Sequence, residues 1–475
     1  MLTDQHRRIW YMCHDAIKHQ STSADHINAA WMHEWQCRPL GASHQGGRHY
    51  AGVNRSEEFP VHRIVDGAMN TASATAPVTL REMWLISAGH MLTHWYPATF
   101  YLLLPLIGRE LGLSYTEIGF TMTAMHGVGA LMSMPGGMLV DMVGRKGTLM
   151  AISLFWIGMP YALLSLTHSY WMMLACVSLV GIGNNLWHPA AIATLAHRYP
   201  ARKGLVLSLH GMGGNVGEAV APLVAGLLLA SLSWRAVVVI NIVPGIIMAT
   251  LIMLFLGAFT IERNRSEAAA PHHLRDYLGN FGRLFRNRAL MLISTATGLR
   301  TLTQSGLLTF LPVYLAYELN YSPFAVGICM AVLQLGGFVA APVGGHLSDK
   351  LGRKRIIMSG MTISGVMIIG MALAAKTFMF VVFVALVGFF LYAMRPALQA
   401  WAMDATPKNM GGSTVGLQFT FSAVGSAVAP AICGMISDAY NIYTAFYFLA
   451  GTIVFANLMM LLMPEETARP AASAT

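Results

Sequence analysis

The stretch GGMLVDMVGRKG at residues 136–147 returns later in the chain as GGHLSDKLGRKR at residues 344–355. The glycine pair, the aspartate and the Gly-Arg-Lys triplet recur in the same order, and Asp349 follows Asp141 by 208 positions. Self-similarity at a fixed offset is the sequence signature of an internal duplication. The motif therefore predicts that the chain contains two related halves.

Two further segments repeat at almost the same offset. HPA at residues 188–190 corresponds to RPA at residues 395–397, 207 positions on. GEAVAP at residues 217–222 corresponds to GSAVAP at residues 425–430, 208 positions on. Three collinear matches predict two bundles that face each other across a central cavity.

The composition indicates where such bundles reside. Of the 475 residues, 55% are hydrophobic and 11% are charged, and the mean hydropathy is +0.54. Soluble domains carry about 25% charged residues. Apolar runs recur from Trp84 to Met463, and each is long enough to cross a bilayer. These numbers exclude an ordinary soluble enzyme and indicate a helical protein that crosses the lipid bilayer many times.

Hydropathy and turn residues together predict twelve membrane spans, six in each half. The spans are expected at 83–107, 115–139, 148–166, 170–194, 204–231, 235–258, 289–317, 323–346, 356–374, 377–402, 412–436 and 441–463. They give an N-terminal extension at 1–80, a six-helix bundle at 81–258, a basic linker at 259–288, a second six-helix bundle at 289–463 and a tail at 464–475. The predicted fold class is an all-α integral membrane protein.

The net charge of +9 is distributed unevenly over the loops between these spans. If Arg81 lies in the cytoplasm, the loops on its side carry 18 Lys and Arg, whereas the opposite side carries three, Arg109, Arg235 and Lys376. This asymmetry follows the positive-inside rule and places both ends of the bundle in the cytoplasm. The basic residues are thus explained by orientation, and no nucleic-acid partner is needed to account for them. As separate expectations, the protein lies in a bacterial inner membrane and acts as a monomer.

The first 68 residues differ from the rest of the chain because they are balanced in charge and hold eight of the 18 His. One interpretation is a cytosolic metal-binding head. The other is a poorly ordered tail, or upstream sequence ahead of a start at Met69. No signal peptide is expected, because no uninterrupted apolar segment follows Met1. The head would use Cys13, His14, His19, His26, His33 and Cys37.

Several function classes lack their motifs in this sequence. The phosphate-binding pattern G-x-x-x-x-G-K-[ST] is absent, which argues against an ATP-driven pump. Neither a zinc motif such as H-E-x-x-H nor a catalytic Ser/His/Asp context occurs, and the five Cys have no metal-ligand spacing. We expect no enzymatic activity and no cofactor.

The repeated loop motif G-x-x-x-D-x-x-G-R-K, between spans two and three and again between spans eight and nine, resembles that of the major facilitator superfamily. More narrowly, NLWHP at 185–189 and KGLVLSLHGMGGNVG at 203–217, together with Arg300, resemble the fosmidomycin-resistance group of bacterial exporters. Ala190 stands where that group has Glu, so the group's drug specificity does not carry over. The resemblance implies a transporter that works by alternating access.

The resemblance also implies a cytoplasmic gate at the repeated loops. A carboxylate at these helix ends can approach a helix N-terminus or pair with an Arg four residues on, as Asp349 can with Arg353. The alternative is a basic loop that only sets orientation. The gate residues are expected to be Gly137, Asp141, Gly144, Arg145, Lys146, Gly345, Asp349, Gly352, Arg353 and Lys354.

Small residues in the fifth span indicate close helix packing. Gly213, Gly217 and Pro222 resemble a degraded antiporter signature of the superfamily, but the pattern recurs in the eleventh span, so we interpret it as packing. We expect these residues to let spans five and eight approach each other.

Ionisable residues inside spans are costly and normally face the bundle interior. Glu218 has Ser426 as its repeat partner, so packing symmetry does not require an acid there. We expect Glu218 and His188 to couple transport to protons, the alternative for Glu218 being a structural hydrogen-bonded acid.

Cationic and polar residues in other spans favour an anionic substrate. Arg395 is the repeat partner of His188, and the expected substrate-binding residues are Arg300, Arg395, Gln304, His90, His94 and Asn215. His90 and His94 have possible metal spacing on one helix face, yet spacing identifies no third ligand near them. We therefore expect them to line the cavity and expect no metal site.

These observations together predict a secondary transporter that exports a small organic or amphiphilic anion in exchange for protons. Proton- or solute-coupled uptake of a carboxylate is the second hypothesis. A membrane sensor without transport activity is the third.

Overall fold

A computed structural model of the chain describes residues 80–257, 284–374, 377–406 and 411–463. The side chains of Met134, Asp141, Ala201, Gly411 and Gly412 are outside this description. The predictions made for the N-terminal extension, most of the linker and the C-terminal tail also lie outside the described residues.

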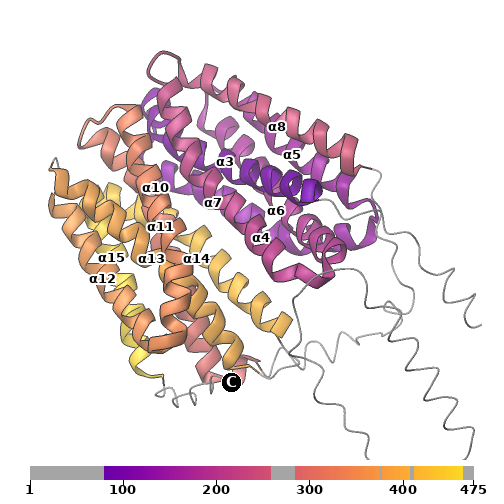
Figure 1. The fold of residues 1–475 in the computed structure, drawn as a ribbon. Helices are drawn as coiled ribbons and strands as arrows, with labels where there is room; N and C mark the ends of the chain where they lie inside the picture. Colours follow the sequence, from indigo (N-terminus) through magenta and orange to yellow (C-terminus); the bar gives the residue numbers. More distant parts are fainter. Residues whose placement is uncertain (1–79, 258–283, 375–376, 407–410, 464–475) are drawn as a thin grey trace, which may run out of the picture. The chain divides into compact units, whose positions relative to one another are not determined.

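Twelve long helices make up the described chain, and no strand occurs in it (Figure 1). The first six are α3 (Leu80–Leu111), α4 (Tyr115–Met142), α5 (Lys146–Leu164), α6 (Tyr170–Arg198), α7 (Lys203–Leu228) and α8 (Trp234–Leu256). The second six are α10 (Arg288–Tyr317), α11 (Pro323–Leu351), α12 (Arg353–Ala374), α13 (Phe378–Asp404), α14 (Gly411–Ala439) and α15 (Ile442–Leu461). A single 3-10 turn, Pro200–Arg202, connects α6 and α7. The all-α fold predicted from the sequence is confirmed.

Seven of the described helices are long and apolar enough to cross a membrane on composition alone: α5, α8 and all of α11 to α15. The other five helices, α3, α4, α6, α7 and α10, are also long, but they carry His, Asn, Thr, Arg and many Gly residues. Four of these helices also supply most of the polar side chains of the candidate site described below.

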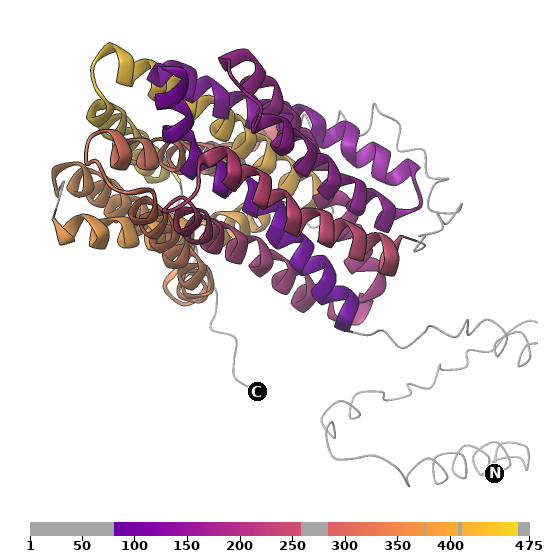
Figure 2. The same cartoon turned by 90° about the horizontal axis from the view of Figure 1, so that it is seen from above.

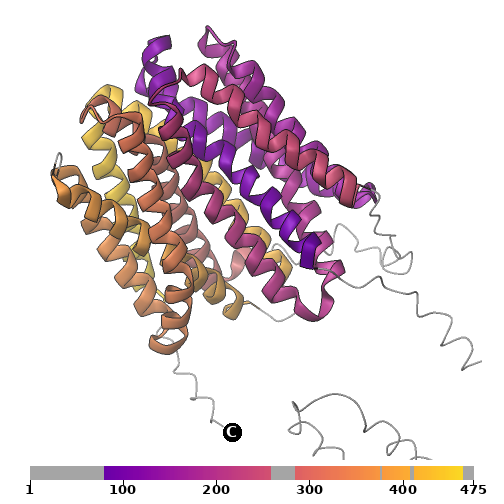
Figure 3. The ribbon, with the colours of Figure 1, turned by 45° about the horizontal axis from the view of Figure 1, so that its top comes forward.

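The two sets of six helices pack in the same way. In the first set α3 packs on α7, and α4 and α5 both pack on α6; in the second set α10 packs on α14, and α11 and α12 both pack on α13. Figures 2 and 3 show the two sets, coloured indigo to magenta and orange to yellow, lying side by side with their helices roughly aligned. The packing pattern therefore repeats as the sequence does.

Contacts between the two sets concentrate at one end of the bundle. We call it the external end, because the positive-inside count places it outside the cell; it carries the loops 112–114, 229–233, 318–322 and 440–441. There the Asp438 carboxylate accepts hydrogen bonds from the backbone N–H groups of Tyr115 (3.0 Å) and Thr116 (2.7 Å). The Tyr317 hydroxyl donates to the carbonyl of Pro105 at 3.0 Å.

Glycines make this contact possible, and they occur as symmetric pairs. Helix α4 touches α14, and α7 touches α11, backbone against backbone. A Cβ atom at Gly226 would lie 2.9 Å from the carbonyl oxygen of Pro323, which real side chains do not tolerate. The contacts are Gly119 with Pro430, its repeat partner Gly327 with Pro222, Gly226 with Pro323, and its repeat partner Gly434 with Tyr115. The described conformation is closed at the external end.

A branched side chain at one of these glycines should open the external end. We expect Gly226→Val to shift the conformational equilibrium toward a state with separated external loops, since the added methyl groups collide with α11. Spin labels are attached at Leu166 and Tyr440, which are exposed in external loops of different halves, after Cys13 and Cys37 have been replaced by Ser. Double electron–electron resonance then measures the distance between the two labels.

The control is Gly451→Val, because a Cβ there meets no atom within 4 Å. Equal distance distributions for Gly226→Val and Gly451→Val would contradict the role of the glycine contact.

Candidate functional site

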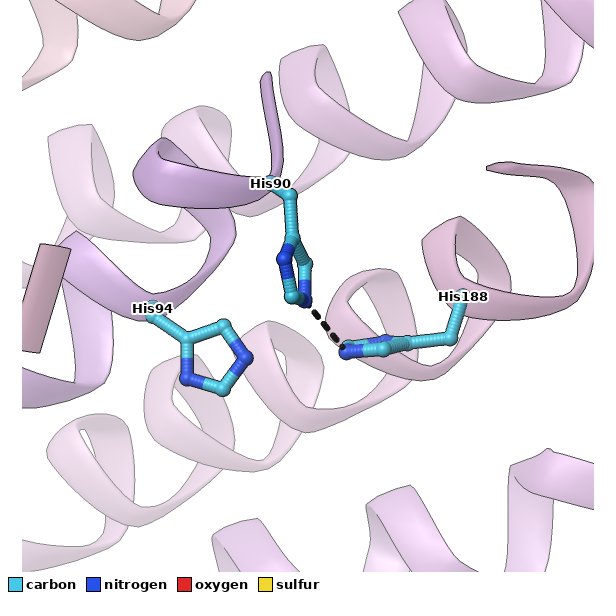
Figure 4. A group of neighbouring side chains, drawn as sticks. All are labelled: His90, His94 and His188. Atoms are coloured by element: carbon cyan, nitrogen blue, oxygen red, sulfur yellow. Dashed lines mark hydrogen bonds between the residues drawn. The ribbon is translucent and has the colours of Figure 1, made fainter. Parts of the chain in front are cut away.

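Three imidazoles and one carboxylate converge near the middle of the first helix set. His90 and His94 lie one turn apart on α3, His188 comes from α6 and Glu218 comes from α7. Figure 4 shows the three rings turned toward one another. The Nε2 atoms of His90 and His188 are 3.2 Å apart, and one ligand-capable nitrogen of each ring lies within 4.8 Å of the others.

Backbone carbonyls orient two of these rings. The Nδ1 atom of His90 lies 2.6 Å from the carbonyl oxygen of His210, and the Nδ1 atom of His188 lies 3.0 Å from that of Asn184. A carbonyl oxygen can only accept a hydrogen bond, so both Nδ1 atoms carry the proton. The ring of His210 stacks on that of His90 with centroids 4.0 Å apart.

Glu218 connects the two helix sets. Its Oε1 atom lies 2.7 Å from Nδ1 of His94, and its Oε2 atom accepts a hydrogen bond of 2.5 Å from Nε2 of Gln334 on α11. Gln334 in turn accepts a hydrogen bond from the hydroxyl of Tyr392 on α13. Hydrogen bonds with an ionised partner are stronger than neutral ones, so the Glu218 carboxylate links the two halves more strongly than a neutral side chain would.

A small cavity adjoins the carboxylate. It has a volume of about 30 Å³, which is room for one or two water molecules and not for an organic substrate. The cavity lies between the halves, because both contribute to its wall. The lining residues are His94, Pro97, Ala98, Tyr101, Glu218 and Pro222 from the first set, and Leu308, Met330 and Gln334 from the second.

The second helix set contributes permanent cations. The Arg300 side chain is 3% exposed, and its Nε donates to the carbonyl of Leu391 at 2.9 Å while its Nη2 donates to Gln304. Arg395 is exposed, and its charge lies within electrostatic range of Glu218, His188 and Arg300. The structure thus brings the predicted coupling residues near the predicted cationic residues.

Asn215 is the remaining predicted substrate-binding residue. It is half-buried on α7, three residues before Glu218 and hence on the same helix face. The part of the chain that the structure describes gives it no hydrogen-bond partner.

The predicted gate residues lie at the opposite end of the bundle from the closed contacts. Asp349 pairs with Arg353 at 3.5 Å, the spacing expected from the sequence, and Nε of Arg353 lies 2.7 Å from Asp404. Gly352 adopts φ +93°, so the turn into α12 needs glycine. Arg145 is exposed.

The remaining predicted gate residues bind backbone carbonyls or lie in turns and open space. The ammonium groups of Lys146 and Lys354 donate to the carbonyls of Val140 and Met463, the latter at 2.6 Å. Gly144 is half-buried in the turn between α4 and α5. A Cβ atom added at Gly137 or Gly345 would meet no neighbour closer than 3.8 Å, and the close approach is made by Gly344 against Ala393.

One packing prediction needs correction. Gly213 and Gly217 do not bring α7 against α11, the eighth span; they face the backbone of Ser87 and Met91 on α3. The approach of α7 to α11 is made further along, where Pro222 meets Gly327. The two glycines pack one turn apart on the face toward α3, whereas Pro222 lies closer to the external end.

Sequence reasoning missed part of this site. The spacing of His90 and His94 identified no third ligand, yet the structure places His188, 94 positions beyond His94, beside them. Tyr392 carried no signal of its own. The repeat offers a partial signal, because His188 and Arg395 already mark corresponding places in the two halves.

A comparison of the sequence with known protein families identifies the family. The sequence model of the Major Facilitator Superfamily matches residues 83–314 and 293–475. The chain belongs to the major facilitator superfamily.

Relatives of this superfamily member are membrane transporters. A phosphoglycerate transporter protein of Salmonella typhimurium is 24% identical over 401 residues, covering 79% of this chain and 86% of that protein. The fosmidomycin resistance protein of Escherichia coli is 22% identical over 395 residues, covering 80% and 92%, in line with the narrower resemblance seen in the sequence.

Solved structures confirm the fold of the superfamily. The structure of a bacterial homologue of the human lysosomal transporter Spinster, in an inward-facing and occupied conformation, has a TM-score of 0.71. It is 17% identical in sequence and covers 82% of this chain and 97% of its own.

The hydrogen bonds of Gln334 generate a stability prediction for this major facilitator protein. Gln334→Leu removes the links to both Glu218 and Tyr392, and we expect it to lower the free energy of unfolding by about 1–2 kcal/mol. Titration with dodecyl sulfate in mixed micelles measures that free energy. Gln399→Leu is the matched control, because Gln399 is exposed on α13 and makes no hydrogen bond among the described residues. Equal losses in the two variants would refute the linking role.

Proposed function

We propose that this multi-pass membrane protein is a secondary active transporter that exports a small organic anion in exchange for protons. Transport activity as such follows from the superfamily and its transporter relatives. The observation that carries the coupling proposal is the position of Glu218, whose carboxylate is shared between His94 of one half and Gln334 of the other.

Protonation of Glu218 changes the link between the halves. The ionised carboxylate accepts hydrogen bonds from both neighbours, whereas the protonated acid has one oxygen that must donate. Gln334 presents an N–H donor to Oε2, so protonation of the carboxylate replaces a charge-assisted hydrogen bond with a weaker neutral one. A contact whose strength depends on protonation biases the equilibrium between inward-facing and outward-facing conformations. His188, within reach of the same cluster, is the second proton site.

The substrate is an anion held by the cations of the second half. Arg300 and Arg395 supply permanent charge, and Gln304 holds the guanidinium of Arg300. We assign His90, His94 and Asn215 to the substrate region as its contribution from the first half. The names of two relatives support an anionic class, because phosphoglycerate and fosmidomycin are both anions at neutral pH.

The repeated loops at the cytoplasmic end act as a latch that holds this end shut in one conformation and releases it in the other. In the described conformation, which is closed at the external end, Arg353 pairs with Asp349 and Asp404 of its own helix set. We infer that the protein lies in the bacterial inner membrane with both ends of the bundle in the cytoplasm and works as a monomer without enzymatic turnover. Uptake of an organic anion is the second candidate, since the name of the phosphoglycerate transporter gives a substrate class that fits either direction of flux.

Flux in inverted vesicles tests the coupling site. Vesicles that have been energised to acidify their interior are challenged with a panel of anionic and cationic compounds, and proton release is followed by a pH-sensitive dye. We expect at least one anion to dissipate the gradient in the wild type and to have no effect with Glu218→Gln, which keeps the shape but cannot carry a proton.

Asp349→Asn is the control that keeps Glu218 intact while altering the latch, and it should retain coupled flux at a changed rate. If Glu218→Gln responds to the same anions as the wild type, Glu218 is structural. If solute accumulates inside right-side-out vesicles with inward proton flow, uptake replaces export.

Arg300 provides a test of substrate binding. Arg300→Ala removes a charged donor, so we expect the affinity for the responsive anion to fall at least about tenfold, the effect of one charge-assisted hydrogen bond. Binding is measured by calorimetry on purified protein. Arg355→Ala, an exposed residue at the cytoplasmic end, should leave the affinity unchanged. Unchanged affinity in Arg300→Ala would remove Arg300 from the site.

A further inference from the structure

The three converging imidazoles have a property that proton coupling does not use. Their Nδ1 atoms all face groups outside the cluster: the carbonyl of His210 for His90, the carbonyl of Asn184 for His188, and the carboxylate of Glu218 for His94. With the proton on Nδ1, a neutral imidazole has its lone pair on Nε2. The lone pairs of three rings therefore point into one space, as the orientation of the rings in Figure 4 shows.

Two nitrogen lone pairs that face each other repel unless a proton or a metal cation lies between them. The Nε2 atoms of His90 and His188 are 3.2 Å apart. Because each Nδ1 already donates to a carbonyl, a hydrogen bond between these two Nε2 atoms requires one ring to be a cation. The other occupant that satisfies several imidazole lone pairs at once is a metal ion.

The arrangement has the features of a metal site with three His ligands. Two nitrogens bound to one tetrahedral zinc ion at about 2.05 Å each lie about 3.3 Å apart, close to the observed separation of His90 and His188. The nitrogen of His94 lies within 4.8 Å of both and would close the site by a small movement of its ring. Three protein ligands leave a fourth position open for water or a donor atom of another molecule.

The surroundings of the rings match those of metal-bound histidines. Such residues usually donate their second N–H to a carboxylate or a backbone carbonyl, which fixes the ring and makes the ligand nitrogen more basic. Here one ring donates to Glu218 and two donate to backbone carbonyls. Glu218 also supplies a negative charge beside the cluster, opposed by the positive charge of Arg395.

We propose that His90, His94 and His188 bind one divalent late first-row transition-metal ion, of the class of zinc, cobalt and nickel, through their Nε2 atoms. Imidazole ligands select this class over magnesium and calcium, which take oxygen ligands. Glu218 orients His94 and is not itself a ligand. The site goes beyond the proposed transport function, because it requires neither a proton gradient nor an anionic substrate. It competes with one part of that function, since a metal ion bound to Nε2 of His188 occupies the atom on which that ring would accept a proton.

Metal titration of the full chain tests the site. The protein is purified in detergent without a histidine tag, treated with chelator and titrated with Zn²⁺ by calorimetry and with Co²⁺ by visible absorption. We expect the wild type to bind one more metal ion per chain than either His188→Gln or His94→Gln, and to show a tetrahedral cobalt spectrum that both variants lose. Other His and Cys residues of the chain contribute equally to all samples.

His126→Gln is the matched control, since His126 lies in the same helix set but contacts Tyr101 at 2.9 Å instead of the cluster. It should keep the wild-type stoichiometry. Glu218→Gln should keep the stoichiometry but weaken the affinity about 10- to 100-fold, the usual effect of losing an outer partner of a metal ligand. Two single ligand variants guard against the failure of one to fold.

Equal stoichiometry and equal cobalt spectra in the wild type, His188→Gln and His94→Gln would overturn the metal site and leave a proton shared between His90 and His188. Because binding is measured without flux, this failure is separate from that of the transport proposal. Vesicle experiments in the presence of chelator test coupling with the metal removed.

Discussion

The structure depends on how a carboxylate is held inside a membrane-spanning bundle. An ionisable group at this depth costs several kcal/mol unless it is paired or hydrated. Glu218 meets this constraint with partners from both helix sets, His94 on α3 and Gln334 on α11, beside a cavity with room for one or two water molecules. A carboxylate that is costly to bury thus also joins the halves, so a change in its charge acts directly on their contact.

The glycine contacts at the external end supply the second half of this argument. Backbone against backbone, α4 meets α14 and α7 meets α11, and the four glycines involved fall into two pairs at the repeat offset. Contacts of this kind depend on shape and not on charge, so they are insensitive to protonation. The polar link at Glu218 lies further inside on the same α7 and α11 pair, where it adds a chemical condition to a steric closure.

Much of this fold was predictable because duplication and hydropathy act over long stretches of chain. The repeated loop motif gave the offset, and the same offset relates Gly119 to Gly327 and Gly226 to Gly434 in the contacts between halves. For the site, the sequence predicted several of the residues but not the contacts between them. Glu218 stands out as an acid within a span, but its partner Gln334 and the approach of His188 to His90 arise from helix packing between distant segments, which spacing along one helix does not report.

The scaffold is symmetric, but its chemistry is not. At the offset of 208, His90 corresponds to Gly298, His94 to Leu302 and Glu218 to Ser426, while Arg300 corresponds to Leu92. Among the residues of the candidate site, the titratable side chains therefore lie in the first half, and the permanently charged guanidinium groups lie in the second. Two equal halves allow the same rocking motion toward either side of the membrane, yet a coupled transporter must distinguish its states. The titratable residues of the first half change their charge when they bind a proton, whereas the guanidinium groups of the second half do not. The net charge of the space between the halves therefore depends on whether the first half is protonated, which distinguishes the states.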